Sequence, residues 1–143
     1  MATINDARLR EILTGSPTVA VLGIHREPEK AAFYVPEYLH DEWYRVIGVN
    51  PEFTTETLFG EPVRATLREI KEPIDIVDVF RRPEDTPSIA DEAVKVGAKA
   101  LWLQTGIVND EAAARAEAGG LLAVMDACVA ATHSLLRVPP KAP

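Results

Sequence analysis

The sequence contains very little cysteine: Cys128 is the single one among 143 residues. One cysteine excludes an intramolecular disulfide and a cysteine-rich metal site, and such low usage is typical of a reducing compartment. The three histidines, at positions 25, 40 and 133, have no metal-ligand spacing. The sequence therefore predicts no metal site and a cytoplasmic protein.

Long apolar runs and an excess of positive charge are also missing. The longest apolar runs, such as residues 19–22, are far shorter than the roughly 20 residues that span a bilayer, and the N-terminus has no charged-then-apolar signal pattern. Lysine and arginine total 15 against 22 aspartates and glutamates, and the net charge of −7 opposes a polyphosphate backbone. We therefore expect neither a membrane nor a nucleic acid as a partner.

Apolar runs and helical stretches alternate along the chain, which at this length and composition predicts a single domain over residues 1–143. The runs typical of strands buried on both faces are 18–22, 45–49, 74–79, 100–103 and 121–124. Helical periodicity occupies 33–41, 66–70, 85–96, 109–118 and 127–136. This alternation needs parallel strands joined by right-handed crossovers. We therefore predict an α/β fold with a doubly wound, mainly parallel sheet of five or six strands and helices on both faces.

The two ends of the chain and one internal proline carry further expectations. Capping-box spacing at Thr3 and Asp6 predicts a short N-terminal helix over residues 3–14. The proline-rich tail 138–143 is expected to be flexible and disposable. Pro36 fits only the first turn of a helix, so regular helix is expected to begin near residues 33–35. The loop after Gly23 is then long, which suits a ligand lying across the strand ends.

Basic residues are concentrated in the loops that follow two of these strands, where open parallel sheets bind ligands. Arg26 and Lys30 follow the first strand, and Arg81 and Arg82 follow the third. Each alone is better interpreted as a solvated loop charge, but their convergence from separate loops makes a phosphate site an equally good interpretation. A nicotinamide or flavin dinucleotide is not favoured, because the first turn lacks G-x-G-x-x-G and the second strand does not end in an acidic residue.

Five blocks within roughly residues 18–136 closely resemble the small stand-alone CoA-binding proteins. The blocks are VAVLG at 19–23, GVNP at 48–51, DIVDVFRRPE at 75–84, GAKALWLQTGI at 97–107 and MDAC at 125–128. That family is similar to the CoA-binding domain of the succinyl-CoA synthetase alpha subunit. The resemblance implies a Rossmann-like domain whose cofactor is coenzyme A rather than a dinucleotide.

The resemblance also implies where CoA would lie. The nucleotide end would meet the first loop and the turn after the second strand, at Gly23, Ile24, His25, Arg26, Asn50 and Pro51. The ligand would be flanked by Phe80, Arg81 and Arg82, and its pantetheine arm would lie near Gln104, Thr105 and Gly106. The first loop departs from the synthetase pattern, with Ile24-His25-Arg26 in place of a second glycine, and Phe53 stands where the synthetase has a lysine. Arg26, Lys30, Arg81 and Arg82 remain alternatives for the phosphate contact.

Few residues are candidates for catalysis. Cys128 follows Asp126, a plausible N-cap, so its thiol could be activated at the start of a helix or be a small buried hydrophobe. An intrahelical pair with His133 is excluded, because five residues separate the two side chains by about 140° around the helix. Asp75 and Asp78 point to opposite faces of their strand, and we expect Asp78 to satisfy nearby backbone donors.

Two function classes remain open. The first is a non-catalytic module that binds CoA or an acyl-CoA as a carrier, sensor or regulator and could act on an unidentified protein partner. The second is a small enzyme acting on a CoA thioester. The binding module is favoured because no nucleophile, base and orienting group converge in the sequence, and we assign no catalytic residue.

Overall fold

The protein is built on a five-stranded parallel sheet; its structure, a computed structural model, describes residues 4–143. The strands are β1 (Thr18–Leu22), β2 (Arg45–Val49), β5 (Ile76–Val79), β6 (Ala100–Leu103) and β7 (Leu122–Val124), in the order β2-β1-β5-β6-β7. Each neighbouring pair is parallel, and Val21 lies in register with both Gly48 and Asp78. The predicted parallel α/β sheet is confirmed, with five strands.

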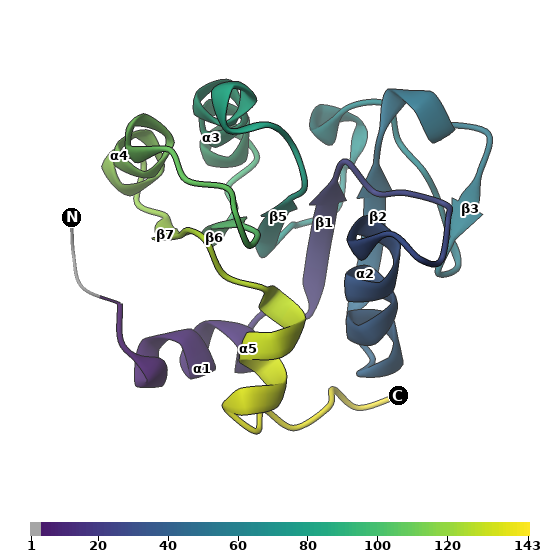
Figure 1. The fold of residues 1–143 in the computed structure, drawn as a ribbon, viewed down its shortest axis with the longest axis horizontal. Coiled ribbons are helices and arrows are strands. Elements are labelled where there is room, and N and C mark those ends of the chain that lie inside the picture. Colours follow the sequence, from purple (N-terminus) through teal and green to yellow (C-terminus); the bar gives the residue numbers. More distant parts are fainter. Residues whose placement is uncertain (1–3) are drawn as a thin grey trace.

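Helices cover both faces of this sheet (Figure 1). One face packs against α1 (Asp6–Thr14), α2 (Ala31–Asp41) and α5 (Val129–Leu135), and the other packs against α3 (Thr86–Lys95) and α4 (Asp110–Ala118). Residues alternate along each strand, so Val19 and Val21 join the first core while Ala20 and Leu22 join the second. The doubly wound arrangement expected from the sequence is therefore present.

The first and last helices begin later than expected. Asn5 caps α1 by accepting a hydrogen bond from the Arg8 amide at 2.9 Å, while Thr3 lies outside the described residues. Cys128 is the N-cap of α5, and its Sγ accepts from the Ala131 amide at 3.5 Å. The last helix, expected from about residue 127, begins at Val129, and Asp126 is not its cap.

The crossover from β2 to β5 contains no α-helix, so the predicted helix over 66–70 is wrong. Its regular elements are the 3₁₀ turns η1 (Pro51–Phe53) and η2 (Leu67–Glu69) and a hairpin of β3 (Thr57–Leu58) and β4 (Glu61–Pro62). The Ile70 amide donates to the Leu67 carbonyl at 3.1 Å, which closes one 3₁₀ turn. Pro73 then disfavours helical backbone at the residue before it. Leu67 and Ile70 therefore cover the sheet from a short irregular segment.

The C-terminal tail is packed against the rest of the protein. Val138 is buried, and the Lys141 amide donates to the Glu42 carbonyl at 2.8 Å. The Lys141 ammonium donates to the Leu13 carbonyl at 2.8 Å and lies 4.7 Å from the centre of the Tyr44 ring. The expectation of a disposable tail does not agree with these contacts, which join it to the end of α1 and to the turn after α2.

Truncation after Arg137 is expected to destabilise the protein. Exposing the Val138 site and losing the Lys141 contacts should cost about 2 kcal/mol, because burying a valine side chain alone is worth roughly that amount. The melting temperature should then fall by roughly 4–8 °C. A chain ending at Lys141 is the control and should melt like the full chain. Equal melting temperatures for all three chains would show that the tail contacts contribute nothing.

A carboxyl group is buried in the centre of the sheet. Asp78 lies in β5 in register with Val21 and Trp102, and none of its surface is exposed. Burial raises the pKa of Asp78 well above its ordinary value, and the neighbouring Val79 amide only partly opposes the shift. The Val79 amide does not reach hydrogen-bond geometry, and neither carboxyl oxygen has a partner among residues 4–143, so the expectation that Asp78 satisfies backbone donors is wrong.

Asp78→Asn is expected to stabilise the protein at neutral pH. Because the folded-state pKa is raised, the folded protein holds a proton that the unfolded chain loses above about pH 4, so wild-type stability falls as pH rises from there. Asparagine stays neutral and removes this dependence. Urea denaturation between about pH 4 and 8 measures both slopes. An unchanged slope in the variant would contradict a buried, protonated Asp78.

Candidate functional site

The strand order places a topological switch point between β1 and β5. The chain leaves β1 toward α2 on one face of the sheet and leaves β5 toward α3 on the other (Figure 1). Open α/β sheets bind ligands at the carboxyl ends of the strands where the connections diverge in this way. The loops that follow these two strands are those that the sequence analysis singled out.

Gly23 brings these two loops into contact. Its φ is +85°, and an added Cβ would lie 2.2 Å from the Phe80 carbonyl oxygen and 3.2 Å from Cδ of Arg81. The Phe80 amide donates to the Leu22 carbonyl at 2.8 Å, which continues the β1–β5 pairing past the strands. A side chain at position 23 is therefore excluded by both conformation and space.

The turn after β2 joins the same cluster through Asn50. The Asn50 side-chain amide donates to the Ile24 carbonyl at 2.9 Å, and its oxygen accepts from the Glu52 amide at 2.9 Å. Pro51 follows as the first residue of η1. The Ile24 side chain is fully buried and packs on Gly48, where an added Cβ would lie 2.7 Å from it. The Ile24 side chain therefore belongs to the core, and Ile24 contributes to this edge through its backbone carbonyl, which Asn50 binds.

A proline inside α2 fixes the first loop. Pro36 lies beyond the first turn of α2, which begins at Ala31 and not near residues 33–35 as predicted. Because proline has no N–H, the Ala32 carbonyl lacks its usual donor four residues later. The His25 amide donates to that carbonyl instead, at 3.1 Å. The same residue that interrupts the helix ladder thus anchors the loop between Gly23 and the helix.

Two of the predicted basic residues share one acidic partner. Asp85 Oδ2 lies 3.8 Å from Nη2 of Arg81 and 3.3 Å from Nε of Arg82, and both arginines are exposed. Exposed pairs of this kind contribute little to stability. Their guanidinium groups also keep further N–H donors, so they can bind an additional anion at the edge of the sheet.

The other two basic residues lie along the first loop. Arg26 is exposed, with its guanidinium 5.4 Å from the centre of the Phe53 ring and 3.9 Å from Glu56. His25 packs edge-on against the same ring at 4.9 Å. Lys30 is exposed at the residue preceding α2. Phe53, which the sequence analysis noted only as a departure, is therefore the side chain that holds His25 and Arg26 together.

A cavity of about 270 Å³ lies between the ends of β1 and β2 and the start of α3; we call it the switch-point cavity. Of the predicted contacts, Gly23, Pro51 and Arg81 line it. Residues 65–67 form a further wall that the sequence analysis missed. Arg64 brings this segment to the cavity by bridging to Val49 beside β2, and no local pattern in the sequence signals that pairing.

The contacts predicted for the pantetheine arm, at residues 104–106, follow β6 at the same edge of the sheet and do not line this cavity. Gln104 is buried, and its side-chain oxygen accepts from the Val129 amide at 3.0 Å. The Gly106 amide donates to Asp126 Oδ1 at 2.7 Å, and Thr105 is exposed. The loop at 104–106 is thus held against the start of α5.

The described part of the chain offers little catalytic or metal-binding chemistry. Within residues 4–143, Cys128 makes no hydrogen bond to a histidine: His25 Nδ1 accepts from the Glu27 amide, and His133 Nδ1 pairs with the Tyr38 hydroxyl. No three histidine, cysteine, aspartate or glutamate residues in this range gather to hold a metal ion. Across the same range, no helix has the length and apolar character needed to cross a membrane.

The fold and this edge define a Rossmann-like class of α/β domain, and comparison with known proteins identifies the family. The chain matches the family described as the CoA binding domain over residues 17–134. It belongs to this family, which confirms the resemblance found in the sequence.

Three similar proteins illustrate how far the likeness extends. Protein YneT of Bacillus subtilis (strain 168) is 35% identical over 137 residues, which cover 96% of this chain and all of YneT. A solved structure from Thermus thermophilus is 41% identical with a TM-score of 0.89, over 93% of this chain and 99% of that one. A dinucleotide-forming acetyl-coenzyme A synthetase from Ca. Korarchaeum cryptofilum shares the fold, with a TM-score of 0.69 and 20% identity over 79% of this chain and 26% of the synthetase.

Pro36→Ala is expected to loosen the first loop while the sheet stays folded. The new amide at position 36 would compete with His25 for the Ala32 carbonyl. Losing a hydrogen bond worth about 1 kcal/mol should speed amide hydrogen exchange at His25 by roughly five- to tenfold. Exchange at Val21, inside β1, is the internal control and should not change. Unchanged exchange at His25 would show that the proline does not hold the loop.

Proposed function

We propose that this protein binds CoA or an acyl-CoA at the carboxyl edge of its sheet, as a non-catalytic module that serves as a carrier, sensor or regulator. The observation that carries the proposal is the switch-point cavity of a CoA-binding-family chain, lined by Gly23, Pro51 and Arg81. These three residues come from the loops after three different strands, and the sequence analysis expected each of them at the ligand.

The size and lining of the switch-point cavity suit one end of CoA. Its volume of about 270 Å³ is just below the roughly 300–1,000 Å³ typical of sites for drug-sized ligands, so it would admit a ring system rather than the whole cofactor. Leu67 and Ile89 supply apolar surface, while Thr66 and Ser88 supply hydroxyl groups. We assign it to the nucleotide end, with the pantetheine arm continuing along the edge toward residues 104–106.

The charges at this edge support a phosphate contact in which the phosphate replaces Asp85 as the partner of Arg81. The protein carries a net charge of −7, so attraction for a phosphate must come from local arginines. Arg81 lines the cavity together with the acidic residues Asp85 and Glu92, and its ion-pair partner within residues 4–143 is Asp85, at 3.8 Å. A phosphate oxygen at hydrogen-bond distance would offer a stronger, charge-assisted interaction than this long pair. Arg26, Lys30 and Arg82 are the further candidates for the remaining phosphates.

The alternative, a small enzyme acting on a CoA thioester, would depend on Cys128. Its Sγ is an acceptor at the start of α5, close to the loop expected to meet the pantetheine arm. No histidine hydrogen-bonds to it within residues 4–143, so the described site shows no histidine positioned as its general base. Turnover of acyl-CoA that is abolished in Cys128→Ala would support the enzyme instead. A protein partner and placement in the cytoplasm remain predictions.

Thermal melting with CoA tests the proposal. A ligand at a hundredfold excess over its Kd adds about 2.7 kcal/mol, which should raise the melting temperature by roughly 5–10 °C. NAD at the same concentration should shift it little, because NAD lacks a pantetheine arm and the first turn lacks the dinucleotide glycines. A shift with NAD and none with CoA would overturn the assignment of the ligand.

The same titration with Arg81→Gln tests the phosphate contact. The loss of a charged hydrogen bond should weaken CoA binding by roughly tenfold or more. Arg115→Gln is a matched control, since Arg115 is exposed to the same degree (40% against 42% for Arg81), is also paired with acidic residues, and lies on α4 away from the cavity. Equal affinity of the two variants for CoA would remove Arg81 from the site.

A further inference from the structure

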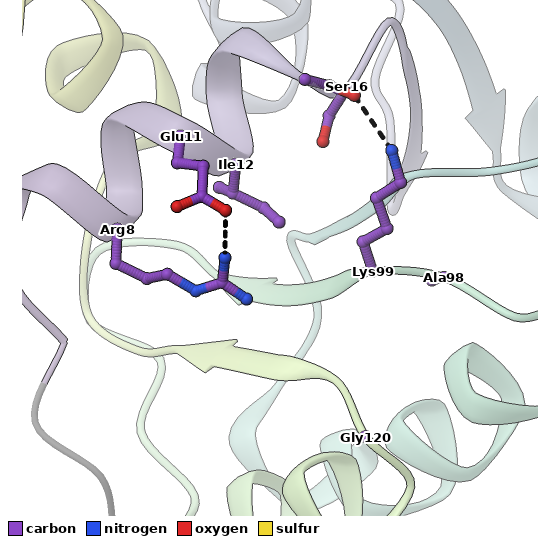
Figure 2. Close-up of a pocket in the computed structure, with 8 residues that line it drawn as sticks. Arg8, Glu11, Ile12, Ser16, Ala98, Lys99 and Gly120 are labelled. Atoms are coloured by element: carbon purple, nitrogen blue, oxygen red, sulfur yellow. Dashed lines mark hydrogen bonds and ion pairs between the residues drawn. The ribbon is translucent and has the colours of Figure 1, made fainter.

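A second and larger cavity lies at the opposite edge of the sheet, where the strands begin. We call it the amino-edge cavity (Figure 2). Its volume is about 470 Å³, and it lies between α1, the residues before β6 and the turn before β7. The residues that matter are Arg8, Glu11, Ile12, Ser16, Lys99 and Gly120. None of them belongs to the proposed CoA site.

Ser16 gives this cavity an unused hydrogen-bonding group. Its exposed fraction is 0%, and its Oγ has no hydrogen-bond partner within residues 4–143. A buried hydroxyl without a partner carries a desolvation cost, and it can both donate and accept. Figure 2 shows the side chain directed into the cavity beside Ile12 and Lys99. A ligand that enters the cavity and shifts its wall enough to reach Oγ could therefore supply the partner that residues 4–143 do not.

Two cationic side chains stand on either side of Ser16 (Figure 2). Arg8 donates to Glu11 Oε1 at 2.7 Å, and the Lys99 ammonium donates to the Gly15 carbonyl at 3.0 Å. Lys99 is also 3.3 Å from Asp75, which does not line the cavity. Guanidinium has five N–H donors and ammonium has three, so both groups keep donors for a ligand. Glu11 offsets one of the two positive charges of the lining, which leaves a net single positive charge.

The rest of the lining is apolar or open. Ile12 and Ala98 are each 7% exposed and form apolar surface in the cavity. Gly120 has a φ of +88°, and nothing lies within 4 Å of a Cβ added there. The cavity therefore combines cations and a hydroxyl with apolar surface and open space for a hydrocarbon body.

We propose that the amino-edge cavity binds a small organic monocarboxylate. The carboxylate would accept hydrogen bonds from the Ser16 hydroxyl and from Lys99 or Arg8, and its apolar body would lie on Ile12 and Ala98. A single negative charge matches the net charge of the lining, whereas a phosphate would leave the apolar surface uncovered. The site is independent of CoA binding, since it lies at the other edge of the sheet.

Titration of the full chain with hexanoate tests the proposal, with 1-hexanol and hexylamine as probes of equal chain length. Amide resonances of Gly15, Ser16 and Gly120 should shift in a saturable way with hexanoate. Its affinity should exceed that of hexanol by roughly tenfold, the worth of a charged hydrogen bond. Absence of saturable shifts, or equal binding of hexanol, would overturn the carboxylate assignment.

Two variants separate a binding role of these residues from a structural one. Ser16→Ala removes the unpaired hydroxyl, so its melting temperature should be equal to or above that of the wild type, while hexanoate affinity falls by roughly fivefold or more. Arg8→Gln should also weaken hexanoate binding, whereas Lys95→Gln, which removes an exposed positive charge on α3, should not. Wild-type affinity in Ser16→Ala, or an equal loss in Arg8→Gln and Lys95→Gln, would overturn the proposal. If Ser16→Ala does not fold, the pair of charge variants decides it.

Discussion

The close approach of Gly23 to the Phe80 carbonyl is the constraint on which the carboxyl edge depends. β1 and β5 remain paired through the Phe80 amide after the last strand residues, and only then do their connections separate to opposite faces of the sheet. A Cβ at position 23 would lie 2.2 Å from the carbonyl, so any other residue would force these strand ends apart. The loops around the switch-point cavity therefore start from fixed positions.

The backbone of this edge is held firmly, while its basic side chains are exposed. Because Pro36 has no N–H, the Ala32 carbonyl of α2 is free to accept from the His25 amide and fixes the first loop. Asn50 joins the turn after β2 to Ile24. Arg81 and Arg26 extend from this frame in loose ion pairs of 3.8 Å and 3.9 Å. A ligand would then reorganise side chains and not loops, which keeps the entropy cost of binding low.

The sequence predicts the sheet well because each strand is a short, mainly apolar run, even though β5 contains Asp78, and such a pattern depends on local composition alone. It misplaces what depends on distant partners. The tail is fixed by Lys141 on the Leu13 carbonyl, more than a hundred residues away in the chain, and the cavity wall at 65–67 is placed by Arg64 beside Val49. The segment at 66–70 has helix-like spacing, but it is too short and too close to Pro73 to extend beyond one 3₁₀ turn.

Asp78 and Ser16 are two of the buried polar residues that lack a hydrogen-bond partner within residues 4–143, and their burial has different physical consequences. Asp78 avoids the cost of a buried charge by holding a proton, which the raised pKa of its carboxyl reflects, and its neutral carboxyl is then left without a hydrogen-bond partner among residues 4–143. The Ser16 hydroxyl is already neutral, so it cannot lower its desolvation cost by changing its protonation state. Its cost is removed only by a hydrogen-bond partner, and Ser16 lines a cavity large enough to contain one between two cations. Asp78 lines neither of the two cavities, so the unpaired hydroxyl, and not the unpaired carboxyl, points to a ligand.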